Sequence, residues 1–200
     1  VKPWDDGLQG RARIEMRALS GETPRLFMAF KVPGAYDPDG LRRLILMDFV
    51  VSGDRAFTYG LTSREPMAVP RSSRLYRLVE EGLGDAVYSY YEVTYMNSLY
   101  TIMVYNVKDP DRVIARIGEL IMERPSEDEL NFARERIMAR LTFSMDSPSK
   151  LAQLYGLSQL FMNDPNGLAS AIESAARLDA GEYMSFVDKL LDRSIAIIYR

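Results

Sequence analysis

The first part of the chain alternates between apolar and polar residues in the way that β-strands do. Residues 11–19 (RARIEMRAL) place apolar residues on one face and charged residues on the other, which predicts a half-buried strand with a solvated outer face. Residues 25–33 (RLFMAFKVP) are more apolar, which predicts a second, more central strand. The sequence SGETP between them is typical of a turn. We therefore expect the two strands to form an antiparallel pair.

Two segments that follow carry helix-start signals. Asp37 precedes a proline, which is favoured in the first turn of a helix. An imperfect apolar stripe continues from it: Leu41, Leu44, Ile45 and Asp48. A second, shorter helix is predicted to begin at Ser72 or Ser73, which can cap it, and to end at Gly82 or Gly84.

Residues 52–71 separate these two helices and show no periodicity. They contain several glycine and proline breaks, so we interpret them as a long insertion loop. Such a loop is either a tolerated surface insertion or a lid or partner-contact segment, in which Phe57 and Met67 would touch the partner. The sequence leaves its role open.

Two β-rich runs come next, residues 85–96 and 99–107, and Asn97-Ser98 between them predicts a hairpin with a short turn. Six tyrosines fall on both faces of this hairpin: Tyr88, Tyr90, Tyr91, Tyr95, Tyr100 and Tyr105. They form either an aromatic binding surface or, as we favour, large amphipathic side chains on a sheet with one solvated face.

The second half of the chain shows helical periodicity. Ser126 with Glu129, and Asp179 with Glu182, have the spacing that caps a helix start. Five helices are predicted, over residues 109–123, 125–145, 147–161, 167–178 and 180–191, and then a final strand over 194–199. This order predicts a single α+β domain over residues 1–200, in which helices cover one face of a mainly antiparallel sheet.

Composition narrows the chemistry that this domain can perform. The 200 residues include no histidine and no cysteine, which excludes Ser-His-carboxylate and Cys-His nucleophilic sites and removes the usual zinc ligands. The net charge is -3 with scattered basic residues, so we expect no nucleic-acid partner. No apolar run is long enough for a membrane span and no signal peptide is visible, so we expect a cytoplasmic protein. The chain begins at Val1, which suggests a segment of a longer protein.

Four sequence segments, in this order and spacing, resemble segments of the pitrilysin-type zinc peptidases. This group includes mitochondrial processing peptidase and the core subunits of the respiratory cytochrome bc complex. The four segments are FKVPGAYDPDGLRRLILMDFV, SSRLYRLVEEGLGDAVYS, PSEDELNFARERIMARL and DAGEYMSFVDKLL. The similarity runs from about Arg11 to Tyr199. The resemblance implies a half-unit of such a peptidase. In that family one half carries zinc on the motif His-x-x-Glu-His, and this chain, without histidine, resembles the other half.

The resemblance also shows what this half lacks. Active members often offer an arginine and, seven residues later, a tyrosine to hold the substrate and stabilise the oxyanion. Those places fall on Glu80 and Val87, and Tyr88 is one position late, on the opposite face of its strand. We therefore assign no catalytic residue and no metal ligand to this chain, and expect it to have no activity alone.

Other polar residues have structural interpretations that compete with functional ones. Glu80 and Glu81 are adjacent and read as solvated acids at a helix end, not as an acid-base pair. Arg74 and Arg77 could contact a peptide carboxylate, although a surface or partner contact fits better. The acids at 37, 39, 109 and 111 lack the remaining ligands of a calcium loop and read as helix starts.

Three functions remain open from the sequence. The first is a non-catalytic half that encloses the peptide chamber and pairs with a zinc-bearing half, in the same chain or in another subunit. The second is a degenerate structural subunit like the respiratory core proteins, and the third is an unrelated α+β binding or hydrolytic domain. A homodimer is also expected, because a half-unit exposes a face built for another half.

Overall fold

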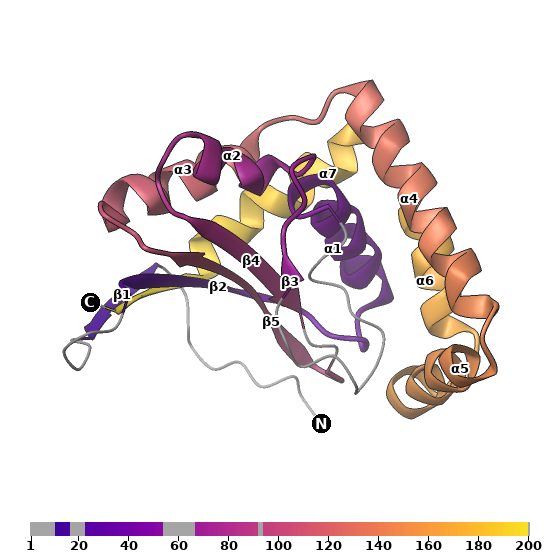
Figure 1. The fold of residues 1–200 in the computed structure, drawn as a ribbon. Helices are drawn as coiled ribbons and strands as arrows, with labels where there is room; N and C mark the ends of the chain where they lie inside the picture. The colour runs from indigo at the N-terminus through magenta and orange to yellow at the C-terminus, as the bar shows by residue number, and fades with distance from the viewer. Residues whose placement is uncertain (1–10, 17–22, 54–66, 92–93, 200) are drawn as a thin grey trace.

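The computed structural model describes residues 11–16, 23–53, 67–91 and 94–199. They form two layers, a mixed six-stranded sheet and a set of helices that pack over one of its faces (Figure 1). The strands lie in the order β1-β6-β2-β5-β4-β3, and every neighbouring pair is antiparallel except β1 and β6. Their bounds are Ala12–Met16 (β1), Arg25–Pro33 (β2), Met67–Ala68 (β3), Ala86–Tyr91 (β4), Asn97–Tyr105 (β5) and Ser194–Tyr199 (β6). The predicted fold class is confirmed.

Four of the described helices, α1, α3, α4 and α7, begin at a residue whose side chain caps the helix. The bounds are Pro38–Val51 (α1), Arg77–Glu80 (α2), Pro110–Met122 (α3), Glu127–Met145 (α4), Pro148–Met162 (α5), Gly167–Ala175 (α6) and Ala180–Leu190 (α7). Two 3₁₀ turns, Arg74–Tyr76 and Leu191–Arg193, precede α2 and follow α7. Asp37 accepts a hydrogen bond from the Gly40 amide at 3.0 Å, and Ser126 with Glu129 forms a capping box. Gly82, at φ 67°, ends α2.

Helix α1 is the centre of the core. Its residues from Leu41 to Val51, apart from two arginines, are buried, and it contacts α4, α6 and α7 as well as β2. A helix that is enclosed on all sides is apolar on all sides, which explains why its sequence shows only an imperfect stripe. The sheet meets this helix layer with every second residue, as in Leu26, Met28 and Phe30 of β2.

The prediction for the first strand is wrong in two respects. Strand β1 pairs with β6 in parallel, not with β2, and all five of its residues are exposed. Strand β2 instead lies between β5 and β6. The apolar sequence SIAIIY makes β6 the better neighbour in the sheet, whereas the charged residues of β1 are tolerated at an edge.

The predicted turn at Asn97-Ser98 is also wrong. Both residues belong to β5, where they pair with Pro33 and Val32, and the connection lies between Tyr91 and Asn97. The carbonyls of residues 94–96 accept hydrogen bonds from the amides of residues 34–36, at 2.8 to 3.0 Å. These partners are distant in sequence, so no local signal reveals this arrangement.

Of the insertion loop 52–71, the structure describes only the ends. Met67 and Ala68 form the short edge strand β3 on β4. The rest of the loop, with Phe57, lies outside the described residues. Its proposed role as a lid or a partner contact stays a prediction.

Candidate functional site

Glu80 and Val87 stand where the resemblance to pitrilysin-type peptidases places an arginine and a tyrosine. The two residues lie in different surroundings. Glu80 is exposed at the end of α2. Val87 is 1% exposed, on the face of β4 that packs against the helices. An acidic group in water and a methyl pair inside the core supply no donor to a developing oxyanion. Tyr88 lies on the opposite face of β4, as alternation predicts.

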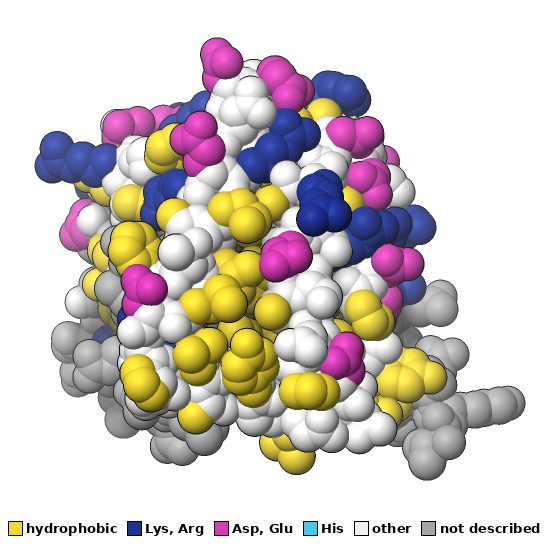
Figure 2. Space-filling model, turned by 90° about the vertical axis from the view of Figure 1, so that its right-hand side faces the viewer, with side chains coloured by type: hydrophobic (Ala, Val, Ile, Leu, Met, Phe, Trp, Pro, Cys, Tyr) yellow, Lys and Arg dark blue, Asp and Glu magenta, His cyan; other side chains and the backbone are white. Residues whose placement is uncertain are grey.

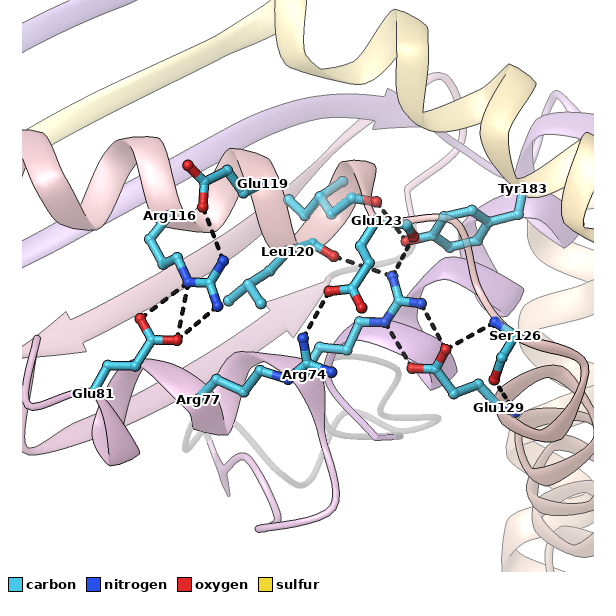
Figure 3. A network of polar contacts seen from close by, with 11 residues as sticks. Arg74, Arg77, Glu81, Arg116, Glu119, Leu120, Glu123, Ser126, Glu129 and Tyr183 are labelled. Carbon is cyan, nitrogen blue, oxygen red and sulfur yellow. Dashed lines mark hydrogen bonds and ion pairs between the residues drawn. The ribbon is translucent and has the colours of Figure 1, made fainter.

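Arg74, in the Ser-Arg-Leu segment, is buried in a network of polar contacts (Figure 3). Its guanidinium donates to both carboxylate oxygens of Glu129, at 3.0 and 2.9 Å, and to the main-chain carbonyls of Leu120 and Glu123. It also lies 5.9 Å from the ring centre of Tyr183. Arg74 therefore joins the start of the Arg74–Tyr76 turn to the end of α3, the start of α4 and α7.

This geometry gives Arg74 a structural role. All of its described partners belong to the chain itself, and the side chain is 2% exposed, so its guanidinium is not available to a peptide carboxylate. The hydrogen bond from Arg74, together with those of Ser126, lowers the pKa of Glu129. Arg74 and Glu129 are consequently both charged at neutral pH.

Replacing Glu129 with glutamine is expected to flatten the acid side of the stability profile. A carboxyl whose pKa is lower in the folded protein adds stability above its unfolded value, about 4.3, and this contribution is lost as the pH falls through the folded value. Urea midpoints between about pH 6 and pH 3 should therefore fall less steeply in Glu129→Gln than in the parent chain. Parallel profiles for the two proteins would contradict this assignment.

The neighbouring charges are surface contacts around the same helix ends. Arg77 pairs with Glu123 at 2.7 Å, and Arg116 donates to Glu81 at 2.6 Å and to Glu119 at 2.9 Å. Hydrogen bonds from Arg116 lower the pKa of Glu81. Glu81 is thus occupied by an arginine of α3 and does not form an acid-base pair with Glu80.

A second polar cluster lies within the core, between α1 and β5. The Tyr100 hydroxyl donates to Oδ1 of Asp48 at 3.0 Å and is hydrogen-bonded to Ser52. Burial, and then the negative charge of Asp48, raise the pKa of Tyr100 far above its ordinary value, so the hydroxyl keeps its proton. An acid within an apolar stripe is the one sequence signal of this cluster. This cluster connects the end of α1 to the sheet through hydrogen bonds. It does not line the groove described below.

The residues do not fit a zinc site. The chain has no histidine or cysteine, and among the described residues no group of three or more acidic side chains could hold a metal ion. Within the same residues, no helix combines the length and the apolar character that crossing a membrane requires.

The face of the sheet away from the helices presents aromatic and aliphatic side chains. Among the described elements, no helix packs on it (Figure 1). Tyr88 and Tyr105 meet edge to face with ring centres 5.2 Å apart, and Arg25 lies 5.0 Å from the centre of the Tyr105 ring. Exposed apolar residues extend the surface at its margins: Ile14, Met16, Tyr90 and Leu99. This open face can contact an extended or apolar partner through rings and methyl groups.

A groove of about 990 Å³ lies elsewhere, between the β2–α1 turn and the end of α5. Tyr36 and Tyr95 form one wall, with ring centres 5.6 Å apart, and Leu160 and Met162 belong to the other. Its arginine, Arg42, is 3.1 Å from Asp39 and 3.6 Å from Glu182. Arg42 of this groove is therefore already paired with carboxylates of the chain. The sequence patterns do not predict the groove.

Sequence comparison alone identifies no relative. No protein-family model matches the chain, and no curated protein matches it either.

Solved structures do share its fold. A protease from Helicobacter pylori superposes with a TM-score of 0.76 at 15% identity, over 96% of this chain and 44% of that one. The M16 peptidase inactive domain from Pseudomonas fluorescens gives 0.69 at 14% identity, over 94% and 43%. A chain of complex III from Candida albicans gives 0.66 at 11% identity, over 96% and 45%.

This chain thus spans less than half the length of these three structures. The similarity extends through almost all of its residues, and it includes a domain described as inactive. The chain has the fold of a pitrilysin-type, or M16-type, peptidase half-unit.

Proposed function

We propose that the chain is the non-catalytic half of a pitrilysin-type zinc metallopeptidase. It pairs with a zinc-bearing half, in the same polypeptide or in a partner subunit, and encloses the peptide chamber. The observation that carries the proposal is the fold of an M16 half-unit in a chain that has no histidine. Zinc and the water-activating glutamate belong to the partner half, and this half holds no metal.

The contribution of this half is to bind and to enclose. Its open face, with Tyr88, Tyr105 and Arg25, is the surface that we assign to the chamber wall. Rings and one guanidinium there contact a peptide without cutting it, and enclosure of the chamber keeps bulk water away from the peptide bound at the partner's zinc site. Glu80 and Val87 supply no oxyanion donor, so transition-state stabilisation falls to the partner half.

The test is reconstitution with the half that carries His-x-x-Glu-His. The two halves, co-expressed and purified with zinc, are expected to cleave unstructured peptides, and either half alone is expected to be inactive. A motif-bearing half that cleaves equally well without this chain would contradict the proposal. So would an inactive complex in which zinc is bound.

The alternative is a structural subunit, and the match to a complex III chain is the observation that favours it. It predicts a partner half that also lacks the zinc motif. The sequence of the adjoining half therefore separates the two functions before any assay.

A further inference from the structure

The register of the strands arranges the open face of the sheet in rows. Residues that pair across neighbouring strands lie on the same face, so each set of partners forms a row that crosses the sheet. The first row, from β1 to β4, is Met16, Tyr199, Arg25, Tyr105 and Ala86. The next two rows, from Ile14 to Tyr88 and from Ala12 to Tyr90, are hydrophobic apart from Thr101. Arg25 is thus the one charged residue in three rows of hydrophobic side chains.

The described part of this face is positive, although the chain as a whole has a net charge of -3. Among the described strand residues, no aspartate or glutamate lies on this face, because Glu15 points to the other side of β1. Lys31, the next charged residue along β2 on this face, already makes an interaction of its own. Figure 2 shows a different balance on the side where α4 and α5 lie, with Lys and Arg side chains among Asp and Glu side chains. The open face therefore complements a negative charge.

The Arg25 guanidinium is positioned by aromatic rings and has no carboxylate partner. It lies 5.0 Å from the ring centre of Tyr105, and Tyr199 is its register partner on the other side. No described residue forms an ion pair with it, and its buried Nε has no hydrogen-bond partner. A guanidinium against a ring keeps its N–H donors at its edge, where two of them can bind one carboxylate. Arg25 differs in this respect from Arg74, whose donors are all taken up by described partners.

The place of Arg25 at the start of β2 sets the pattern that a ligand must have. The hydrophobic rows follow it on one side only, through Phe27 and Ala29. Successive rows are two residues apart along a strand, and an extended peptide has the same period. A peptide that lies along β2 with a carboxylate at Arg25 therefore places its second and fourth neighbours on the hydrophobic rows.

We propose that the open face selects acidic peptides. An Asp or Glu side chain of an extended segment pairs with Arg25, and apolar residues two and four positions away contact the rows of Phe27 and Ala29. That a peptide reaches this face rests on the proposed function, and the selection for an acidic residue is the additional claim. A basic peptide is disfavoured, because it brings its charge to a cation without a described carboxylate beside it.

Fluorescence anisotropy of the chain with rhodamine-labelled peptides tests this selection. The first probe is Leu-Ser-Phe-Ser-Glu-Ser-Phe-Ser-Leu with both ends blocked, so that glutamate is the only charged group of the peptide itself. Two further probes carry glutamine or lysine at that place. The glutamine probe should bind about fivefold more weakly than the first, as expected of one accessible ion pair, and the lysine probe more weakly still.

Arg25→Met removes the charge and keeps an unbranched side chain. The glutamate probe should then bind no more tightly than the glutamine probe, whose own affinity should not change. The matched control is Arg71→Met, because Arg71 also lies against a tyrosine, 6.0 Å from the ring centre of Tyr76, but outside the strands. This variant should keep the full preference for glutamate.

Equal affinities of the parent chain for the three probes would overturn the proposal, whether or not the variants fold. A folded Arg25→Met protein that still prefers glutamate would overturn it too. So would a chain that binds none of the probes, the result expected if a second copy covers this face.

The reconstituted complex separates this inference from the proposed function. An active complex that cleaves the lysine probe as efficiently as the glutamate probe, compared by kcat/KM, refutes the selection and leaves the peptidase assignment intact. A zinc-loaded complex that cleaves no probe contradicts the proposed function, while a preference for glutamate measured on the chain alone still supports the selection.

Discussion

Replacing Arg74 with alanine is expected to lower the free energy of unfolding by about 3 kcal/mol, at the low end of what removing one partner of a buried ion pair costs. The low end applies because Glu129 is about a third exposed, at 35%. The substitution removes the two hydrogen bonds that this carboxylate accepts from Arg74, and it removes the guanidinium donor from the carbonyls of Leu120 and Glu123. Urea denaturation with an unchanged m-value measures the loss.

Arg77→Ala is the matched control for this experiment. Arg77 lies three residues further along and pairs with Glu123, but its side chain is 39% exposed. A solvated pair of this kind contributes at most about 1 kcal/mol. Equal losses in the two variants would show that Arg74 is not the buried connection between the helices.

Restoring the tyrosine that the family resemblance places at position 87 is expected to destabilise the protein by about 3 kcal/mol, because overpacking a filled core forces its neighbours apart. Val87 is 1% exposed, pairs with Val104 and faces the helices. The Val87→Tyr hydroxyl would be buried in the core instead of facing a peptide. We therefore expect no gain of activity in a reconstituted complex, even together with Glu80→Arg.

Ala86→Tyr places the same ring on the neighbouring residue, which faces the open side of the sheet beside Tyr105. Cross-strand aromatic pairs are favourable, so this control should change the unfolding free energy by less than about 1 kcal/mol. A Val87→Tyr protein as stable as the parent, measured by the same denaturation, would contradict the packing described for β4.

The signals that the sequence carries within a few residues predict the local structure well. Asp37 before its proline, the Ser126–Glu129 box and Gly82 each act on the backbone of their own turn, and each one marks a helix end in the structure. Alternation also separates Val87 from Tyr88 correctly. It does not say which face of the strand meets the helices, because that depends on the whole sheet.

The errors concern partners that are distant in the chain. The choice of β6 over β2 as the neighbour of β1, and the binding of residues 94–96 to the β2–α1 turn, depend on competition between segments that only the folded chain brings together. For the same reason, the role of Arg74 in the Ser-Arg-Leu segment cannot be predicted from the sequence. An arginine suits a surface contact, a peptide contact and a buried ion pair equally well, so its identity does not decide between them. The partners of Arg74 come from three other helices that are distant in sequence.

The parallel pairing of β1 with β6 also bears on how the chain reaches this fold. Ala12 pairs with Ile195, so the first described strand has no place in the sheet until nearly the whole domain has been synthesised. Contacts of such sequence separation close late and slow the final step of folding. Until then β1 and the flank of β2 are open edges, and Arg13 and Glu15 on β1 lower the risk that another chain pairs there first.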